Sequence, residues 1–164
     1  MTTITQAVIE ADPTVPIIRI TRDFAATPEQ VHRAHTDPDL FLRWVGPDGM
    51  TGAIDYWDAR TGGSWRYTAQ HGDGSDGMRF AFRGCFHDVR PERIVQTFTW
   101  EAQPDGVALE TLVLTDLGGG RTRLQVESLC DSFEGRDAWL RSGMEVGVNH
   151  GYAKLDRMLA AGEV

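Results

Sequence analysis

The glutamate at position 110 is the acidic residue whose setting in the sequence points most directly to chemistry. It lies in the segment ALETLVLTD, where it alternates in phase with Leu112 and Leu114. Because successive side chains of a strand point to opposite faces, Glu110 faces inward if those leucines do. An interior carboxyl group has a raised pKa and could act as a general acid or base, or anchor a hydroxyl or amine of a ligand. The alternative is a glutamate near a strand end that is solvated or paired with an arginine.

Aromatic residues form a second candidate set, because they alternate along three other segments. The pairs are Trp65 with Tyr67, Phe80 with Phe82, and Phe98 with Trp100. We expect these faces to line a cleft that binds a small hydrophobic or aromatic molecule, oriented by Glu110 and Tyr67. The residues expected to contact it are Trp44, Trp57, Trp65, Tyr67, Phe82, Phe98, Trp100, Leu112, Met144, Val148 and Tyr152. A filled core built from the same side chains is the alternative.

The elements that must position these residues begin with a strand and two short helices. The segment IIRITRDF, residues 17–24, alternates apolar and polar side chains as a half-buried strand does. Thr27 followed by Pro28 and Gln30 is typical of a capping box, which predicts a helix that ends near His35. Asp37 followed by Pro38 predicts a second helix, which ends before Gly46.

Six consecutive strands are predicted next, separated by turn signals rich in glycine, proline and aspartate. They are residues 51–58, 63–70, 78–89, 93–101, 108–116 and 121–129. With the first strand, they predict an antiparallel sheet of seven strands, and hence an α+β fold.

The last segment predicts one long amphipathic helix from about Gly135 to Ala160. Its apolar residues recur every three or four positions, at Leu140, Met144, Val148, Tyr152, Leu155 and Leu159. Three glycines lie beside this stripe, at Gly143, Gly147 and Gly151. Because glycine destabilises a helix, they indicate a groove that another group approaches closely.

Other polar residues have weaker claims to a site. His35 ends the first helix, where a cation suits the helix dipole, and His87 is out of phase with the inward aromatics of its strand. Glu145 and Asn149 could border the cleft, although a solvated helix face is the favoured explanation for them.

Composition and motifs exclude several classes of function. The chain has 164 residues, a net charge of −8 and an isoelectric point near 5.0, which argues against binding nucleic acid phosphates. Cys85 and Cys130 form no metal-binding or disulfide pattern, and no metal, nucleotide or other cofactor motif occurs. Neither a secretory signal nor an apolar run long enough to span a membrane is present, so we expect a cytoplasmic protein.

The order of elements and four longer motifs resemble one protein superfamily. The motifs are DPDLFLRWVGP, DYWDARTGGSWRY, GCFHDVRPERIVQTFTWE and GMEVGVNHGYAKLDRML. They are similar to the SRPBCC superfamily, whose members include START-like and birch-pollen-allergen-like proteins, and in particular to the branch related to the activator of heat-shock-protein-90 ATPase. The resemblance covers Ile17 to Leu159. It implies a helix-grip fold, in which a seven-stranded antiparallel sheet wraps around a long C-terminal helix and encloses an apolar pocket.

The resemblance and the residues together predict a single domain over residues 15–164, preceded by a flexible arm over residues 1–14. The expected function is binding of a small hydrophobic ligand, with no cofactor. One alternative is a cyclase, hydrolase or lyase that uses Glu110 as acid or base; another is a co-chaperone-like module that binds a protein partner. An exposed apolar patch on the convex face of the sheet would favour the partner-binding module. An exposed helix or edge strand would allow two copies to pair as a homodimer.

Overall fold

The computed structural model describes residues 2–75 and 77–164, which form an antiparallel sheet with helices on one face. The sheet order is β1-β2-β8-β7-β6-β5-β4-β3, and every pairing is antiparallel. The strands are β1 (Val8–Ala11), β2 (Ile17–Phe24), β3 (Met50–Trp57), β4 (Ser64–His71), β5 (Arg79–Arg90), β6 (Arg93–Trp100), β7 (Ala108–Asp116) and β8 (Thr122–Leu129). The helices are α1 (Pro28–Thr36), α2 (Pro38–Trp44), α3 (Phe133–Arg141) and α4 (Met144–Ala160).

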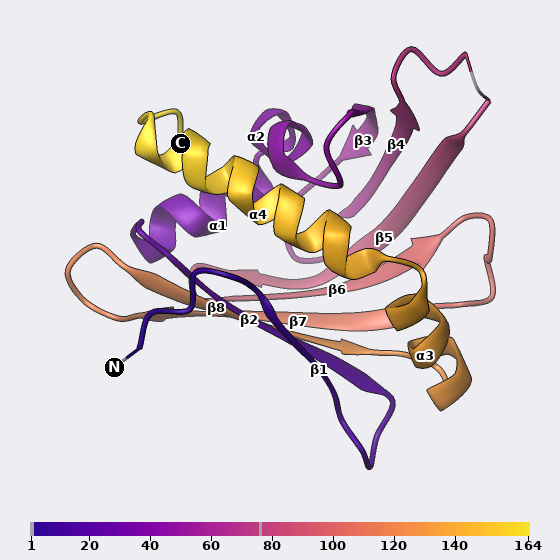
Figure 1. Cartoon of the computed structure of the whole chain (residues 1–164), viewed down its shortest axis with the longest axis horizontal. Coiled ribbons are helices and arrows are strands. Elements are labelled where there is room, and N and C mark those ends of the chain that lie inside the picture. Colours follow the sequence, from indigo (N-terminus) through magenta and orange to yellow (C-terminus); the bar gives the residue numbers. More distant parts are fainter. Residues whose placement is uncertain (1, 76) are drawn as a thin grey trace.

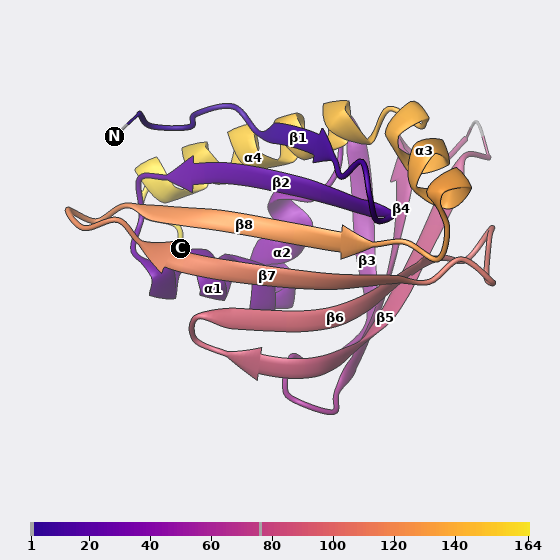
Figure 2. The same ribbon diagram turned by 90° about the horizontal axis from the view of Figure 1, so that it is seen from below.

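The sheet curls around α4, which is the arrangement of a helix-grip fold. Figure 1 shows α4 lying across the sheet, with α1 and α2 on the same side. In the view of Figure 2, β3 and β4 run steeply across the direction of β2, β7 and β8. This curl gives the sheet a concave face toward α4, so the α+β helix-grip prediction is confirmed.

The two short helices begin where their capping residues predict. The Thr27 side chain accepts a hydrogen bond from the Gln30 backbone N–H at 3.3 Å, and the Gln30 side chain accepts one from the Thr27 N–H at 3.0 Å. The Asp37 carboxylate accepts the backbone N–H groups of Asp39 and Leu40 at 3.0 and 3.2 Å. These side chains satisfy N–H groups that have no partner within the helix.

The segment expected as a flexible arm contains a strand, and in this respect the sequence prediction is wrong. Val8–Ala11 forms β1 at the sheet edge, with Val8 opposite Thr21 in β2. The preceding residues are also held, since the Ala7 N–H donates to Asn149 Oδ1 at 3.1 Å. Four residues with only Ile9 half-buried show too little alternation to reveal a strand. The sheet therefore has eight strands among the described residues, one more than expected.

The expected long helix is two helices that meet at Gly143. This glycine has a φ of +85°, in the left-handed region that non-glycine residues avoid, and the helical hydrogen bonding is interrupted there. Leu140 and Met144 keep a four-residue spacing across the break, so the apolar pattern gives no sign of it. The chain therefore changes direction at Gly143, between the end of α3 and the start of α4.

Gly151 of α4 lies against Trp44, the last residue of α2. A Cβ added there would stand 2.9 Å from the Trp44 carbonyl oxygen, whereas one at Gly147 would have its nearest neighbour, Pro47 Cδ, at 3.5 Å. The expectation of a close approach along the glycine stripe therefore applies to Gly151.

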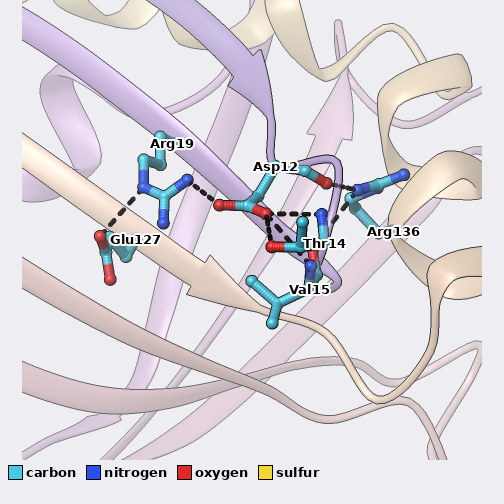
Figure 3. Close-up of polar contacts among 6 residues, drawn as sticks. All are labelled: Asp12, Thr14, Val15, Arg19, Glu127 and Arg136. Carbon is cyan, nitrogen blue, oxygen red and sulfur yellow. Dashed lines mark hydrogen bonds and ion pairs between the residues drawn. The ribbon is translucent and has the colours of Figure 1, made fainter.

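The loop between β1 and β2 holds α3 in place. Figure 3 shows Asp12 at its centre, accepting hydrogen bonds from Thr14 and from the Arg19 guanidinium, with the Thr14 N–H at 2.8 Å. Arg136 of α3 is buried and donates to the backbone carbonyl of Asp12 and, at 3.5 Å, to that of Val15. These contacts fix α3 beside the end of the sheet where α4 begins (Figure 1).

No helix in the described part of the chain is both long and apolar enough to cross a membrane.

Candidate ligand-binding site

A cavity of about 310 Å³ lies between the concave face of the sheet and the first half of α4, and it is partly open to solvent. Of the residues expected at a ligand site, those that line it are Trp44, Trp57, Trp65, Tyr67, Phe82, Phe98, Glu110, Leu112, Met144, Val148 and Tyr152. The helices and the sheet thus bring together residues that are up to 108 positions apart, from Trp44 to Tyr152.

Trp100 is the one expected residue that does not line this cavity. It borders a neighbouring hollow and contacts Phe80, with ring centroids 6.5 Å apart. Alternation places Trp100 on the same side of β6 as Phe98, but two residues farther along, a step of roughly 6–7 Å. That step carries the indole past the end of the cavity.

The aromatic side chains pack against one another and leave the cavity between them. Trp65 stacks on Tyr67 with centroids 5.8 Å apart, and Tyr67 contacts Phe82 at 5.2 Å and Phe41 at 5.3 Å. Trp139 of α3 meets Phe98 edge-on at 5.7 Å. These contacts fix the ring orientations, so much of the wall is already formed without a ligand.

A polar stripe crosses this apolar wall on three neighbouring strands. Gln96 of β6 lies opposite Glu110 of β7, which in turn lies opposite Ser128 of β8, and all three line the cavity. Gln96 Nε2 donates a hydrogen bond to Glu110 Oε2 at 2.9 Å. The register thus supports the carboxyl group from both sides with uncharged side chains.

The Glu110 carboxyl group has no cationic partner in the part of the chain that the structure describes. Burial raises its pKa above the usual value, and the hydrogen bonds from Gln96 and Ser128 oppose that effect only in part. Glu110 retains some accessible surface, which faces the cavity.

Two tyrosine hydroxyls lie near this carboxyl group. Tyr67 and Tyr152 are both 6% exposed, and burial together with the negative charge of Glu110 raises the pKa of each phenol. Neither hydroxyl has a hydrogen-bond partner among the described side chains and backbone groups. Both hydroxyl groups are therefore available to form hydrogen bonds with a ligand.

His35 lies in the cavity wall, where the sequence had suggested a cation at a helix end. Burial lowers its pKa to about 4, and its Nδ1 lies 2.7 Å from the Val31 carbonyl oxygen. The imidazole is therefore neutral near pH 7.

The cavity wall also contains residues that the sequence did not predict as ligand contacts, among them Gln96, Ser128, His35, Phe41 and Trp139. The strand register would have found Gln96 and Ser128, because both face Glu110 across neighbouring strands. Phe41 and Trp139 depend on how the helices dock, for which the sequence gives no signal.

The remaining candidates lie away from the cavity. Glu145 and His87 are exposed, and Asn149 accepts the Ala7 N–H. Among residues 2–75 and 77–164, no three His, Cys, Asp or Glu side chains gather as a metal site requires.

Solved structures of other proteins have the same fold over nearly the whole of this chain. A protein from Rhodobacter sphaeroides is 29% identical, with 94% of this chain and 98% of that one covered and a TM-score of 0.82. A protein from Arthrobacter aurescens is 23% identical, covering 96% and 93%, with a TM-score of 0.84. DynU16, from the dynemicin biosynthetic locus, is 24% identical over 90% of this chain and 48% of its own length, with a TM-score of 0.63.

No curated protein sequence matches the chain significantly. The model of one family, described as activator of Hsp90 ATPase homolog 1-like protein, matches residues 25–160. That range runs from the end of β2 to the end of α4 and includes the helices, six strands and most of the cavity wall. The chain therefore belongs to the family of activator of Hsp90 ATPase homolog 1-like proteins.

Proposed function

We propose that the protein binds a small hydrophobic or aromatic molecule in the cavity between the sheet and α4. The observation that carries this proposal is a cavity of about 310 Å³ whose wall is mainly aromatic and is crossed by one polar stripe. Small-molecule sites commonly measure roughly 300–1,000 Å³ and combine apolar walls with a few polar groups. The cavity is at the small end of this range, which favours a compact ligand.

The polar groups would orient the ligand within this wall. Glu110 lies at the centre of the stripe, and the hydroxyls of Tyr67 and Tyr152 lie near it. A polar atom of a bound molecule would gain hydrogen bonds from groups that the protein leaves unpaired. The aromatic body would fill the space beside Phe98 and Val148.

Two substitutions on α4 test this proposal. Val148→Phe places a ring in the cavity, whereas Val146→Phe places the same ring on a residue that is 53% exposed. Binding of 2-phenylethanol, followed by tryptophan fluorescence, should weaken by about tenfold or more in the first variant and stay unchanged in the second. Equal affinity in a folded Val148→Phe protein would contradict the proposal. Native mass spectrometry of the purified protein would show a retained ligand and whether two copies pair.

Acid–base catalysis is a second candidate function, favoured by the raised pKa and inner position of Glu110. A carboxylate in this cavity could remove an α-proton from a bound aromatic ketone and return a solvent deuteron. NMR of 1-indanone in D₂O should then show exchange faster than in buffer, and Glu110→Gln should return the rate to the buffer value. Exchange at the buffer rate with the unmodified protein would exclude this candidate for ketones.

A partner-binding role, which the family name suggests, has one supporting feature. Leu109 and Leu129 are paired across β7 and β8 on the outer face and are 43% and 40% exposed. Two half-exposed leucines cover less than the few hundred Å² typical of the largest apolar patch on a monomer. The cavity therefore supports ligand binding more strongly than the outer face supports a protein partner.

We also propose that the protein functions in the cytoplasm. Cys85 and Cys130 are both free thiols, one exposed and one buried. Unpaired cysteines suit a reducing compartment.

A further inference from the structure

The charge inside the cavity is unbalanced. Glu110 brings a carboxyl group to the wall, and its hydrogen-bonding neighbours Gln96 and Ser128 carry no charge. No lysine or arginine is among the residues described as lining the cavity, and His35 is neutral. An ionised carboxylate away from bulk water is costly unless a positive charge approaches it. None of residues 2–75 and 77–164 supplies that charge to Glu110.

The walls around Glu110 suit a positive charge as well. Burial and the charge of Glu110 raise the pKa of the phenols of Tyr67 and Tyr152. Arg22, which is paired with Asp156, opposes that effect in part at Tyr152. Trp44 lies beside Tyr152, with ring centroids 5.8 Å apart. Aromatic ring faces attract cations, and the attraction is strongest where water is excluded. A carboxylate combined with several aromatic rings is a favourable setting for an ammonium group.

The neighbouring hollow carries the same sign of charge. It shares Ala108 and Trp139 with the cavity wall, so the two spaces adjoin. Its described lining includes Asp105, Asp131 and Glu134 and no basic residue. Carboxylates along an approach raise the local concentration of cations and lower that of anions.

We propose that the molecule bound in the cavity is an organic cation: a protonated amine or quaternary ammonium group carried on a compact aromatic or apolar body. The ammonium group pairs with Glu110 among the rings of Tyr67, Tyr152 and Trp44, and the apolar body fills the space beside Phe98 and Val148. This inference rests on the proposed ligand-binding function and adds the charge of the ligand. It also implies that carboxylic acids of the same shape are rejected.

Three probes of nearly equal shape isolate the charge. 2-Phenylethylamine, 2-phenylethanol and phenylacetate carry +1, 0 and −1 near pH 7, and tryptophan fluorescence or calorimetry can follow their binding. We expect the amine to bind about tenfold or more tightly than the alcohol, and phenylacetate to bind more weakly than either. An amine that binds no more tightly than the alcohol would overturn the cation assignment and leave the binding function standing.

Matched substitutions locate the effect. Glu110→Gln should bring the amine and the alcohol to within about twofold of each other, because it removes the charge and nearly keeps the shape. Glu127→Gln makes the same change on the outer side of β8, where Glu127 pairs with Arg19 at 3.1 Å, and should keep the preference for the amine. Loss of the preference in both variants would indicate a general charge effect and overturn the proposal. Alcohol binding that survives in Val148→Phe would instead contradict the binding function itself.

Discussion

Two carboxyl groups, the buried Asp23 and the half-buried Glu110, lie opposite residues near the two ends of β8, Arg123 and Ser128, and have different partners. The Asp23 side chain is 2% exposed and accepts two hydrogen bonds from Arg123, at 2.7 and 2.9 Å. The Ile4 N–H adds a third at 2.9 Å, and these partners hold the pKa of Asp23 below its usual range. The partners of Glu110 among the described residues, Gln96 and Ser128, are neutral, and burial raises the pKa of Glu110.

The difference separates a region that holds the fold together from one that is available to a ligand. The second half of α4 belongs to the first region, since Asp156 pairs with Arg22, which is 4% exposed. The first half belongs to the second, since Met144 and Val148 face the cavity. The paired charges of Asp23 and Arg123 stabilise the folded state, because losing either partner would leave the other charge buried. The carboxyl group of Glu110, in contrast, remains available to a charged or polar group of a ligand.

Breaking the paired region should have the largest effect. Arg123→Met leaves the Asp23 carboxylate buried without its cation, which should lower the free energy of unfolding by about 3–5 kcal/mol. Urea denaturation measures this loss. Arg60→Met is the control, because Arg60 pairs with Asp58 while its own side chain is 79% exposed, and it should cost less than about 1 kcal/mol. Similar losses in the two variants would show that the Asp23–Arg123 pair contributes no more to stability than an exposed ion pair.

Packing on α4 should give the next largest effect. Gly151→Ala brings a Cβ to 2.9 Å from the Trp44 carbonyl oxygen, and a clash with backbone cannot be relieved by turning a side chain. We expect a loss of about 1–3 kcal/mol in thermal or urea unfolding. A stability equal to that of the unmodified protein would mean that α2 and α4 separate easily.

Glu110→Gln should increase stability, in contrast to losses in the paired region. The raised pKa means that folding favours the neutral carboxyl group, so the cost of ionisation is absent at low pH and grows as pH rises through the folded-state pKa. We expect a gain of about 1 kcal/mol at pH 8 that disappears near pH 4. His35 titrates in both proteins and contributes little to the difference.

The pH dependence of Asp23 has the opposite sign. Its lowered pKa stabilises the folded state above the usual value of 3.8 and loses that contribution as pH falls through the folded-state pKa. Unfolding measured from pH 8 to pH 3 in Asp23→Asn and Glu110→Gln should therefore show changes of opposite sign at pH 8, both of which shrink on acidification. Changes of the same sign at pH 8 would contradict the comparison.

Gly147→Ala should have the smallest effect. An added Cβ meets Pro47 Cδ at 3.5 Å, an ordinary contact, and alanine favours the helix by about 1 kcal/mol over glycine. We expect stability to be unchanged or slightly increased, in contrast to Gly151→Ala. A loss as large as that of Gly151→Ala would show that the cavity end of α4 is packed as tightly as its other end.

Much of the fold could be predicted because its signals are local. The caps at Thr27 and Asp37 and the alternation in β2 and β4–β8 each depend on neighbouring residues, and the elements lie within one or two residues of their predicted bounds. β1 and the break at Gly143 were missed for the same reason. The strand is too short to show alternation, and the break preserves the spacing of apolar residues.

The sequence predicted which face of each strand lines the candidate site, but not where the cavity ends. Alternation placed Glu110 with Leu112 and Tyr67 with Trp65, and all four line one cavity. Alternation could not show that Phe98 lines the cavity and Trp100 does not, because the end of the cavity depends on the curl of the sheet. It also could not pair Glu110 with Gln96 and Ser128, because that requires the register of three strands.

The sequence by itself determined which side chains point toward the interior, because strand and helix periods are properties of the local backbone. Only the tertiary structure decided that the interior is not full and that Glu110 lacks a cation while Asp23 has one. Whether a cavity remains and whether a carboxyl group is paired depend on which residues from distant parts of the chain come into contact. Arg123 of β8 pairs with Asp23 of β2, and no basic residue in the described chain pairs with Glu110. That outcome is set by how the sheet curls around α4.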